Sequence, residues 1–315
     1  MKIGVTGGAG YIGSLLVKKL IERGHYVISI DNLMNGNYGL LKDCGVDEEA
    51  ELLEGDIRDF YFLQESFSGC DAIAHLAALP GLVKCQESPE EASTINVYGT
   101  YNVLKAAKQL GIGKVVFCSS AAVYGRPEEL PVTESHPLNP LNLYGVTKLA
   151  GEKLMEAFHL NDGINTVTLR FGNVFGVGLY TNYDTVIPKF VRMALDGKEL
   201  TVYGDGTSSR DFVHIEDIVQ AINLALESER RGNEVFNVGG ETMLIGDLAR
   251  HIKELIEKRS GIKVGIVNLP PRMGETKEFS YNLEKIREAL GYKPRWSVIK
   301  GIMQIIDHRL EEMDF

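Results

Sequence analysis

A glycine-rich turn near the start of the chain constrains the fold more than any other feature of the sequence. The apolar run Lys2–Thr6 leads directly into Gly7, Gly10 and Gly13, which have the spacing GxxGxxG and open an amphipathic stretch. Glycines at these points permit a tight turn, a close approach of the backbone to a pyrophosphate, and close packing of a helix on a strand. Free N–H groups at the start of such a helix bind phosphate. The pattern therefore predicts the first strand, turn and helix of a dinucleotide-binding fold.

Two acidic residues at the ends of later strands indicate which dinucleotide is bound. Asp31 ends the second predicted strand, eighteen residues after Gly13. A carboxylate there accepts hydrogen bonds from the ribose hydroxyls of NAD and repels the 2′-phosphate of NADP. Asp56 closes the third strand, where it can meet the adenine amino group. The alternative is a structural glycine turn with a surface aspartate; the strand–turn–helix context argues against it, and we predict NAD.

The first half of the chain alternates short apolar runs with longer amphipathic stretches, which is typical of βαβ units and a parallel sheet. Later, turn-rich stretches separate helix-like segments near 184–196, 245–259 and 298–313. We predict an α/β fold: a Rossmann-type, doubly wound parallel sheet with a smaller, mixed α/β C-terminal substrate lobe. Residues 1–172 would form the dinucleotide-binding domain, with roughly 211–240 returning to it, and 173–315 mainly the substrate lobe. The predicted strands of the sheet are Lys2–Thr6, Tyr26–Ile30, Ala50–Leu53, Ala72–Leu76, Lys114–Cys118, Thr166–Arg170 and Glu234–Val238.

The composition argues against several kinds of partner. A formal net charge of −10 disfavours nucleic acid or an anionic membrane as the main partner. The four cysteines are scattered, with no CxxC pair and no nearby histidine ligands, so we expect neither a metal site nor a disulfide framework. The N-terminus runs straight into a strand pattern, and no apolar run is long enough to span a bilayer. A cytoplasmic location is the simplest expectation.

Tyr144 and Lys148 are four residues apart and would therefore lie on one face of a helix. Free tyrosine is a poor base at neutral pH, but a lysine ammonium and a positively charged nicotinamide ring nearby would both favour the phenolate. This helix follows the fifth strand, which ends at Ser119 and Ser120, where parallel sheets bind ligands. Ser120 is well placed to bond a substrate hydroxyl. The alternatives are a solvated helix face and serines that only cap a turn; no histidine pairs with either serine, which excludes an acyl-transfer triad.

These residues together resemble the extended short-chain dehydrogenase/reductase family, and in particular its NAD-dependent nucleotide-sugar epimerases of the UDP-glucose/UDP-galactose 4-epimerase type. The resemblance spans nearly the whole chain. It implies reversible oxidation at C4 of a nucleoside-diphosphate hexose, most of all UDP-glucose or UDP-galactose, through a transient 4-keto sugar. The motifs that carry it are Gly7–Gly13, Asp31, Asp56-Ile57, His75–Ala78, Asn96–Thr100, Ser119–Gly125, Tyr144–Lys148, Arg170–Gly176 and Gly204–Asp211.

The resemblance also implies a role for each matching residue. The catalytic residues would be Ser120, Tyr144 and Lys148. The NAD site would comprise Gly7, Gly10, Tyr11, Ile12, Gly13, Asp31, Asn32, Asp56, Ile57, Leu76, Ala77, Ala78, Asn96, Tyr144 and Lys148. The nucleotide sugar would be bound by Ser120, Tyr144, Asn173, Arg210, Arg272, Glu275 and Phe279, with the two arginines on its diphosphate.

Two positions separate this chain from other members of that family. Related dehydratases and decarboxylases carry acidic residues directly after the catalytic serine or threonine, whereas this chain has Ala121 and Ala122, which cannot act as acid or base. Phe279, in an alignment that could shift by one residue, suggests an unsubstituted hexose. Alternatives remain: 4-epimerization of a UDP-uronic acid or a UDP-N-acetylhexosamine, another nucleotide-sugar oxidoreductase, or a non-catalytic NAD sensor. The helices expected near 93–110 and 142–161 could pair in a homodimer, as they do in the family.

Overall fold

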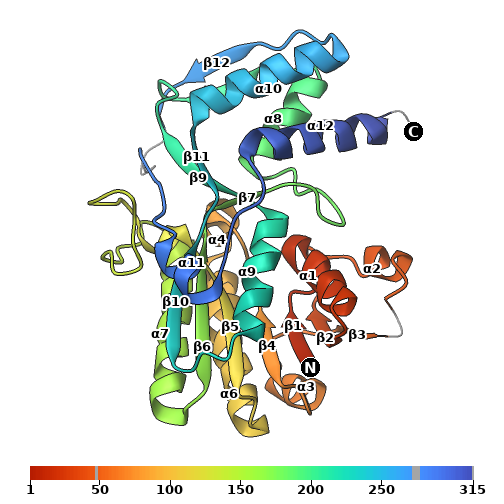
Figure 1. The fold of residues 1–315 in the computed structure, drawn as a ribbon, viewed down its shortest axis with the longest axis vertical. Helices are drawn as coiled ribbons and strands as arrows, with labels where there is room; N and C mark the ends of the chain where they lie inside the picture. Colours follow the sequence, from red (N-terminus) through yellow and green to blue (C-terminus); the bar gives the residue numbers. More distant parts are fainter. Residues whose placement is uncertain (47–48, 272–276, 314–315) are drawn as a thin grey trace.

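A seven-stranded parallel sheet forms the centre of the larger lobe in the computed structural model, which describes residues 1–46, 49–271 and 277–313 (Figure 1). The strand order is β10-β6-β5-β4-β1-β2-β3, and every neighbouring pair is parallel. The order reverses between β1 and β4, so the sheet is doubly wound and the predicted α/β fold is confirmed. The strands are β1 (Lys2–Thr6), β2 (Tyr26–Asp31), β3 (Ala50–Glu54), β4 (Ala72–His75), β5 (Lys114–Ser120), β6 (Asn165–Phe171) and β10 (Asn233–Val238).

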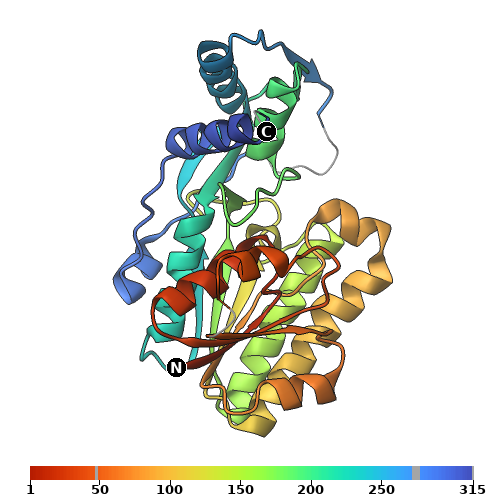
Figure 2. The ribbon, with the colours of Figure 1, turned by 90° about the vertical axis from the view of Figure 1, so that its right-hand side faces the viewer.

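Helices cover both faces of this sheet (Figure 2). On one face lie α1 (Tyr11–Glu22) and α9 (Ile215–Glu227), and on the other α3 (Phe60–Ser66), α6 (Thr100–Leu110) and α7 (Leu143–Asp162). Gly111 and Gly163 end α6 and α7 in the left-handed conformation, with φ of 69° and 72°, which a residue with a Cβ rarely adopts. The shorter helical segments are α2 (Gly39–Asp43), α4 (Leu82–Glu87), α5 (Pro89–Ser93), a π-helical turn (Thr94–Gly99) and a 3₁₀ turn (Ala121–Val123).

The smaller lobe lies beyond the carboxyl ends of the sheet strands (Figure 1). It has an apolar core of its own, between its helices and its two small sheets, which are ordered β11-β9-β7 and β12-β8. α11 (Glu284–Leu290) does not belong to it, because this helix packs on β10 and α9 of the larger lobe. The elements of the smaller lobe are β7 (Asn173–Phe175), α8 (Val186–Leu195), β8 (Leu200–Tyr203), β9 (Ser209–His214), β11 (Glu241–Leu244), α10 (Ile245–Ser260), β12 (Ile266–Leu269) and α12 (Val298–Met313).

A buried carboxylate joins the segments that connect the two lobes. Asp211, in β9, accepts hydrogen bonds from the backbone N–H of Gly240 at 2.9 Å and of Tyr281 at 3.4 Å. Gly240 lies between β10 and β11, and Tyr281 precedes α11. The Asp211 side chain therefore bonds both the segment that leaves the large sheet after β10 and the segment that returns to it before α11. Burial raises the pKa of Asp211 to about 6, although these donors act in the opposite direction.

Candidate active site

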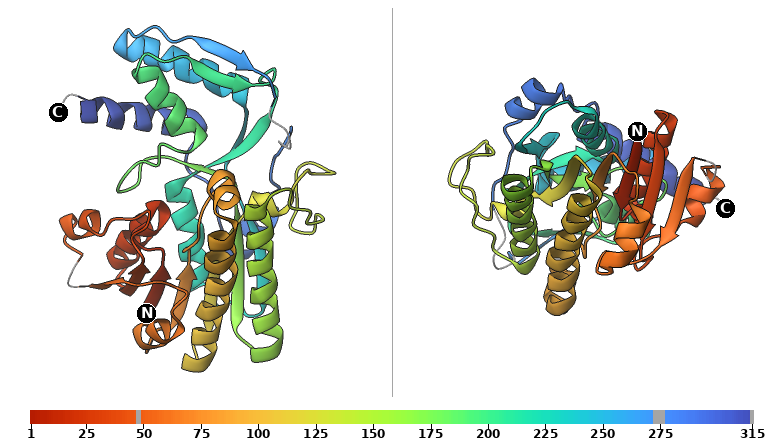
Figure 3. Two further views of the ribbon diagram at one scale, coloured as in Figure 1. Left: turned by 180° about the vertical axis from the view of Figure 1, so that it is seen from behind. Right: turned by 90° about the horizontal axis from the view of Figure 1, so that it is seen from below.

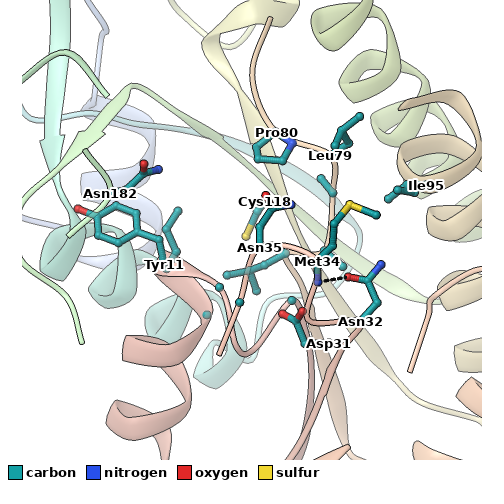
Figure 4. Close-up of a pocket in the computed structure, with 18 of the residues that line it drawn as sticks. Tyr11, Asp31, Asn32, Met34, Asn35, Leu79, Pro80, Ile95, Cys118 and Asn182 are labelled. Carbon is teal, nitrogen blue, oxygen red and sulfur yellow. Dashed lines mark hydrogen bonds between the residues drawn. The ribbon is translucent and has the colours of Figure 1, made fainter. Parts of the chain in front are cut away.

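A cavity of about 530 Å³ opens at the carboxyl ends of β1, β2, β4 and β5, where the sheet changes direction (Figure 4). Ligands of doubly wound sheets bind at this point. Segments that are far apart in the sequence meet there: the glycine turn, the end of β2, the loop after β4, the end of β5, the start of α7 and residues 180–184. Of the predicted NAD-site residues, those that line it are Gly7, Gly10, Tyr11, Ile12, Gly13, Asp31, Asn32, Ile57, Leu76, Ala77, Ala78, Tyr144 and Lys148.

The glycine turn leaves no room for side chains and therefore exposes its backbone to the cavity. Gly7 has a φ of +73°, and a Cβ added to it would lie 2.8 Å from the backbone nitrogen of Ala77. A Cβ added to Gly13 would lie 2.0 Å from the carbonyl oxygen of Gly7. Gly10 is the N-cap of α1 without a side-chain cap, so the first N–H groups of this helix face the cavity without a competing side chain. This cradle has the donors and the space that a diphosphate requires.

Asp31 lies at the end of β2, beside the glycine turn (Figure 4). Its carboxylate accepts hydrogen bonds from the backbone N–H of Ala9 at 3.0 Å and of Leu33 at 2.8 Å. Burial raises the pKa of Asp31 although these bonds favour the charged form. A carboxylate held rigidly at this edge of the cavity suits the ribose hydroxyls of NAD, so the acidic residue, the glycine cradle and the cavity all fit this cofactor.

The predicted adenine residue Asp56 does not line the cavity, although its neighbour Ile57 does. Asp56 accepts a hydrogen bond from Nδ2 of Asn32 at 3.1 Å and forms an ion pair with Arg58 at 2.7 Å. Partial burial raises its pKa, but the hydrogen bonds from Arg58 and Asn32, together with the charge of Arg58, lower it overall. The charge of Asp56 is thus balanced by Arg58, and its side chain fixes Asn32 in the cavity wall.

Tyr144 and Lys148 project from the first turns of α7 into the cavity. The Nζ of Lys148 donates a hydrogen bond to the carbonyl oxygen of Cys118 at 2.8 Å and lies 5.9 Å from the centre of the Tyr144 ring. Burial lowers the pKa of Lys148 to about 8. Burial raises the pKa of Tyr144 to about 12, and a hydrogen bond with Ser120 acts in the opposite direction. The two groups therefore sit where a nearby positive charge would favour the phenolate.

Ser120 ends β5 and performs the capping role that the sequence left open. Its Oγ accepts a hydrogen bond from the backbone N–H of Ala122 at 3.2 Å and caps the 3₁₀ turn. Ser119 does not cap this turn; its hydroxyl donates to Glu152 at 2.6 Å. Ser120 thus has a fixed orientation beside Tyr144, while the residues after it, Ala121 and Ala122, offer no titratable group.

Asn96 supports the cavity from behind and does not line it. Its Oδ1 accepts a hydrogen bond from the N–H of Leu79 at 2.7 Å, and its Nδ2 donates to Oγ1 of Thr147 at 3.0 Å. The first bond fixes the loop after β4 and the second fixes α7. The side chain of Asn96 therefore acts on the walls of the cavity, and its contact with the cofactor stays a prediction.

Apart from Tyr144, the predicted substrate residues, including Ser120, lie outside the cavity walls or outside the described residues. Asn173 is exposed at the start of β7, and Arg210 lies in β9, where its Nη1 donates to the carbonyl oxygen of Ser209 at 2.8 Å. Arg272 and Glu275 fall in the segment 272–276, outside the residues that the structure describes. The predicted diphosphate site on the two arginines therefore remains a prediction.

Phe279 belongs to a small apolar cluster and is only 6 % exposed. Its ring centre lies 4.9 Å from that of Tyr281 and 6.3 Å from that of Tyr124. It does not line the cavity. A role in selecting the size of the sugar is not visible in these contacts and stays a prediction.

The segment 180–184 is a part of the cavity wall that no sequence pattern revealed. It comes from the smaller lobe, after β7, and Figure 4 shows Asn182 beside Tyr11. The ring centres of Tyr11 and Tyr180 are 5.8 Å apart, and the hydroxyl of Tyr11 donates to the carbonyl oxygen of Gly176 at 2.6 Å. The helix that follows the glycine turn thereby anchors the segment that closes the cavity from the smaller lobe.

Comparison with known proteins identifies the family. The model of the NAD dependent epimerase/dehydratase family matches residues 3–239. The chain belongs to this family. It is 35 % identical to the UDP-glucose 4-epimerase of Lacticaseibacillus casei, over 96 % of this chain and 95 % of that protein. Membership in the NAD dependent epimerase/dehydratase family confirms the predicted enzyme type and its dependence on NAD.

Solved structures agree with this assignment. The chain is similar to UDP-glucuronic acid 4-epimerase from Bacillus cereus in complex with UDP-glucuronic acid and NAD, with a TM-score of 0.91, 31 % identity, and coverage of 99 % of this chain and 100 % of that one. It is also similar to UDP-glucose 4-epimerase from Thermotoga maritima with UDP-glucose, with a TM-score of 0.89, 30 % identity, and coverage of 99 % and 100 %. Among the residues that the structure describes, no group of three or more Asp, Glu, His or Cys side chains could hold a metal ion. None of the described helices is both long and apolar enough to span a membrane.

Proposed function

We propose that this protein catalyses NAD-dependent epimerization at C4 of a nucleoside-diphosphate hexose, with UDP-glucose and UDP-galactose as its substrate pair. The observation that carries the proposal is the placement of Tyr144 and Lys148 in the wall of the same cavity as the glycine cradle and Asp31. A base, a cation beside it and a dinucleotide site in one cavity suit the reversible oxidation of a hydroxyl group.

Each catalytic side chain has a defined task in this scheme. Bound NAD supplies the group that takes up a hydride from C4 of the sugar and gives it back. Tyr144, as a phenolate, removes the proton of the 4-hydroxyl. It returns the proton after the transient 4-keto sugar has rotated to present its opposite face. Lys148 favours the phenolate by its charge, and Ser120 orients the 4-oxygen by a hydrogen bond. The nucleotide, bound far from the reacting carbon, contributes the binding energy that orients the sugar ring.

The placement of acidic residues in and beside the cavity favours epimerization over elimination. Asp31 and Asp184 are the carboxylates among its described lining residues, and Asp31 is held by two backbone N–H groups. The positions directly after Ser120 are Ala121 and Ala122, so no carboxylate there can remove a proton from the neighbouring carbon. Tyr144 is sufficient as the acid–base group for oxidation and reduction at C4.

The identity of the sugar separates two candidates within this reaction. The Lacticaseibacillus casei relative is named for UDP-glucose, which supports the hexose. The Bacillus cereus structure, with its TM-score of 0.91, holds UDP-glucuronic acid, which supports a uronic acid as the second candidate. The chemistry at C4 is the same in both, so the difference must lie in contacts with C6 of the sugar.

A panel of nucleotide sugars tests the proposal. The protein, as purified and without added NAD, is incubated with UDP-glucose, UDP-galactose, UDP-glucuronic acid, UDP-N-acetylglucosamine and dTDP-glucose, and the products are separated by anion-exchange chromatography. We expect UDP-glucose and UDP-galactose to interconvert fastest, and a faster uronic acid would select the second candidate. Turnover that consumes added NAD stoichiometrically would indicate an oxidoreductase, and NAD binding without turnover of any sugar would indicate a sensor.

We also propose that the protein is a homodimer that pairs through α6 and α7. These helices lie side by side on one face of the larger lobe (Figure 3, left). Leu160 on α7 is 74 % exposed and Tyr98, just before α6, is 52 % exposed. Tyr101 stacks on Tyr98, with ring centres 6.2 Å apart, and meets Phe158 edge to face, with ring centres 6.0 Å apart. Exposed large apolar side chains on two neighbouring helices support a protein–protein interface on this face.

A further inference from the structure

A buried ion pair lies directly behind the catalytic face of α7. The side chains of Glu152, on α7, and Arg170, on β6, are 5 % and 4 % exposed. Nη2 of Arg170 donates to Oε2 of Glu152 at 2.6 Å, and Nε donates to Oε1 at 3.0 Å. Neither residue lines the cavity. Burying two charges is costly unless the geometry satisfies both, so this pair calls for an explanation beyond stability alone.

Glu152 also holds the end of β5, on which part of the catalytic site is built. Its Oε1 accepts a hydrogen bond from the hydroxyl of Ser119 at 2.6 Å. One helical turn earlier, Lys148 donates to the carbonyl oxygen of Cys118 at 2.8 Å. Successive turns of α7 are thus bonded to successive residues of β5. The next residue of that strand, Ser120, bonds Tyr144.

The other half of the pair is fixed just as firmly. Nη1 of Arg170 donates to the hydroxyl of Tyr124 at 2.8 Å and to the carbonyl oxygen of Glu134 at 3.2 Å. The hydroxyl of Tyr124 in turn donates to Oδ1 of Asn237, on β10, at 2.6 Å. Arg170 is therefore anchored to the large sheet from several sides, and Glu152 docks α7 onto this anchor.

Besides forming these hydrogen bonds, Glu152 acts on Lys148 through its charge. Burial lowers the pKa of Lys148, and the Glu152 carboxylate is one of the neighbours that raise it. The titratable or charged groups that face Lys148 are Tyr144 and Glu152 on α7, Cys118 on β5, Cys85 on α4 and His75 on β4. Burial lowers the pKa of His75 to about 3, and the thiol pKa of each cysteine is raised, so these groups are neutral near pH 7. Among these facing groups, Glu152 is the one carboxylate.

We propose that Glu152 is a positioning residue for the reaction, which docks the Lys148 turn of α7 against the end of β5 and keeps the lysine charged beside Tyr144. The inference rests on the proposed function, since it assigns a task within the same catalytic site. Glu152 does not line the cavity and acts through Lys148 and Ser119. Its loss changes the ionisation of the site, whereas loss of a merely structural pair would change only the stability of the fold.

The test follows the titration of Lys148 in the NAD-bound protein and needs no substrate. The protein is labelled with [ε-¹³C]lysine, and the Lys148 resonance is assigned by its absence in Lys148→Met. Glu152→Gln keeps an acceptor for Ser119 but removes the charge, and we expect it to lower the titration midpoint of Lys148 by about one pH unit. The matched control is Glu156→Gln, one turn further along α7, where an exposed glutamate pairs with Lys153 at 2.8 Å. This control should leave the midpoint unchanged.

Activity with the nucleotide sugar gives a second readout. A less charged Lys148 favours the Tyr144 phenolate less, so the rising limb of the kcat profile should move to higher pH in Glu152→Gln, with KM changed less than about twofold. If this variant does not fold because Arg170 is left unpaired, Glu152→Gln/Arg170→Gln removes both charges, and its Lys148 midpoint is compared with that of Arg170→Gln alone, so that the effect of the Glu152 charge is still isolated. A wild-type Lys148 midpoint in folded Glu152→Gln, or equal midpoints in the double variant and Arg170→Gln, would overturn the proposal. If the wild-type protein shows no turnover of any nucleotide sugar, the proposed function is refuted, while the titration of Lys148 still reports on Glu152.

Discussion

The glycine turn offers a test in which the same substitution has opposite consequences at two positions. Gly13→Ala places a Cβ 2.0 Å from the carbonyl oxygen of Gly7, about 1 Å closer than real Cβ contacts come. That oxygen is backbone, and the N–H of Gly7 is bonded to Ile30 at 2.7 Å, so the turn cannot easily move away. Overpacking of this kind costs about 3 kcal/mol, and the better helix propensity of alanine returns about 1 kcal/mol. For a chain of 315 residues, the net loss of ~2 kcal/mol should lower Tm by roughly 3 °C.

Gly10→Ala is the matched comparison within the same turn. Its Cβ would lie 3.2 Å from the same oxygen, which a shift of a few tenths of an ångström relieves. The cost to stability should stay below about 1 kcal/mol, since alanine is only a poorer N-cap than glycine. The methyl group would, however, occupy the cradle, and loss of one charge-assisted hydrogen bond to the diphosphate should weaken NAD binding about tenfold or more.

Both variants are measured by thermal unfolding of the NAD-free protein and by calorimetric titration with NAD. We expect Gly13→Ala to lose stability and Gly10→Ala to lose affinity. The reasoning would be refuted if Gly13→Ala melted within 1 °C of the wild type, or if Gly10→Ala lost as much stability as Gly13→Ala.

Three further predictions concern the base, the lobe junction and the dimer. Tyr144→Phe should lower kcat by about 10²–10⁴-fold while NAD stays bound, and near-normal turnover would exclude Tyr144 as the base. Because burial raises the pKa of Asp211 in the folded state, its contribution to stability is present below pH ~4 and is lost as pH rises through about 6. Urea titrations at several pH values should show a loss of ~3 kcal/mol in the wild type that Asp211→Asn lacks, and parallel curves would contradict this. Leu160→Glu should convert the proposed dimer to a monomer in sedimentation experiments, whereas an unchanged mass would exclude this face as the interface.

Local patterns were sufficient for the sheet and for one side of the cavity. Strands such as Lys2–Thr6 are short apolar runs that are buried on both faces, and the glycine spacing demands a particular backbone, so both can be recognised without tertiary information. The spacing of Tyr144 and Lys148 fixes their common helix face for the same reason. These features depend on residues that are close in the sequence.

The remaining features depend on pairings between distant segments. No periodicity shows that Lys148 donates to the carbonyl oxygen of Cys118, or that Arg170 meets Glu152 eighteen residues before it. The segment 180–184 reaches the cavity only because the smaller lobe folds back over α1. The hydrogen bonds of the Asn96 amide with Leu79 and Thr147 likewise join segments that are far apart in the sequence.

The position of the ion pair suggests how one scaffold can serve several nucleotide sugars. Tyr144, Lys148 and Glu152 follow one another at intervals of four residues along one face of α7, from the cavity to the buried core. The groups that ionise are therefore carried by a rigid helix, which is docked on a rigid strand. Contacts with the sugar are expected from the smaller lobe, on separate elements such as β7 and β9. Exchange of residues in that lobe should consequently change which sugar is accepted while the titration of Lys148 stays the same, whereas a change at Glu152 should slow every substrate alike.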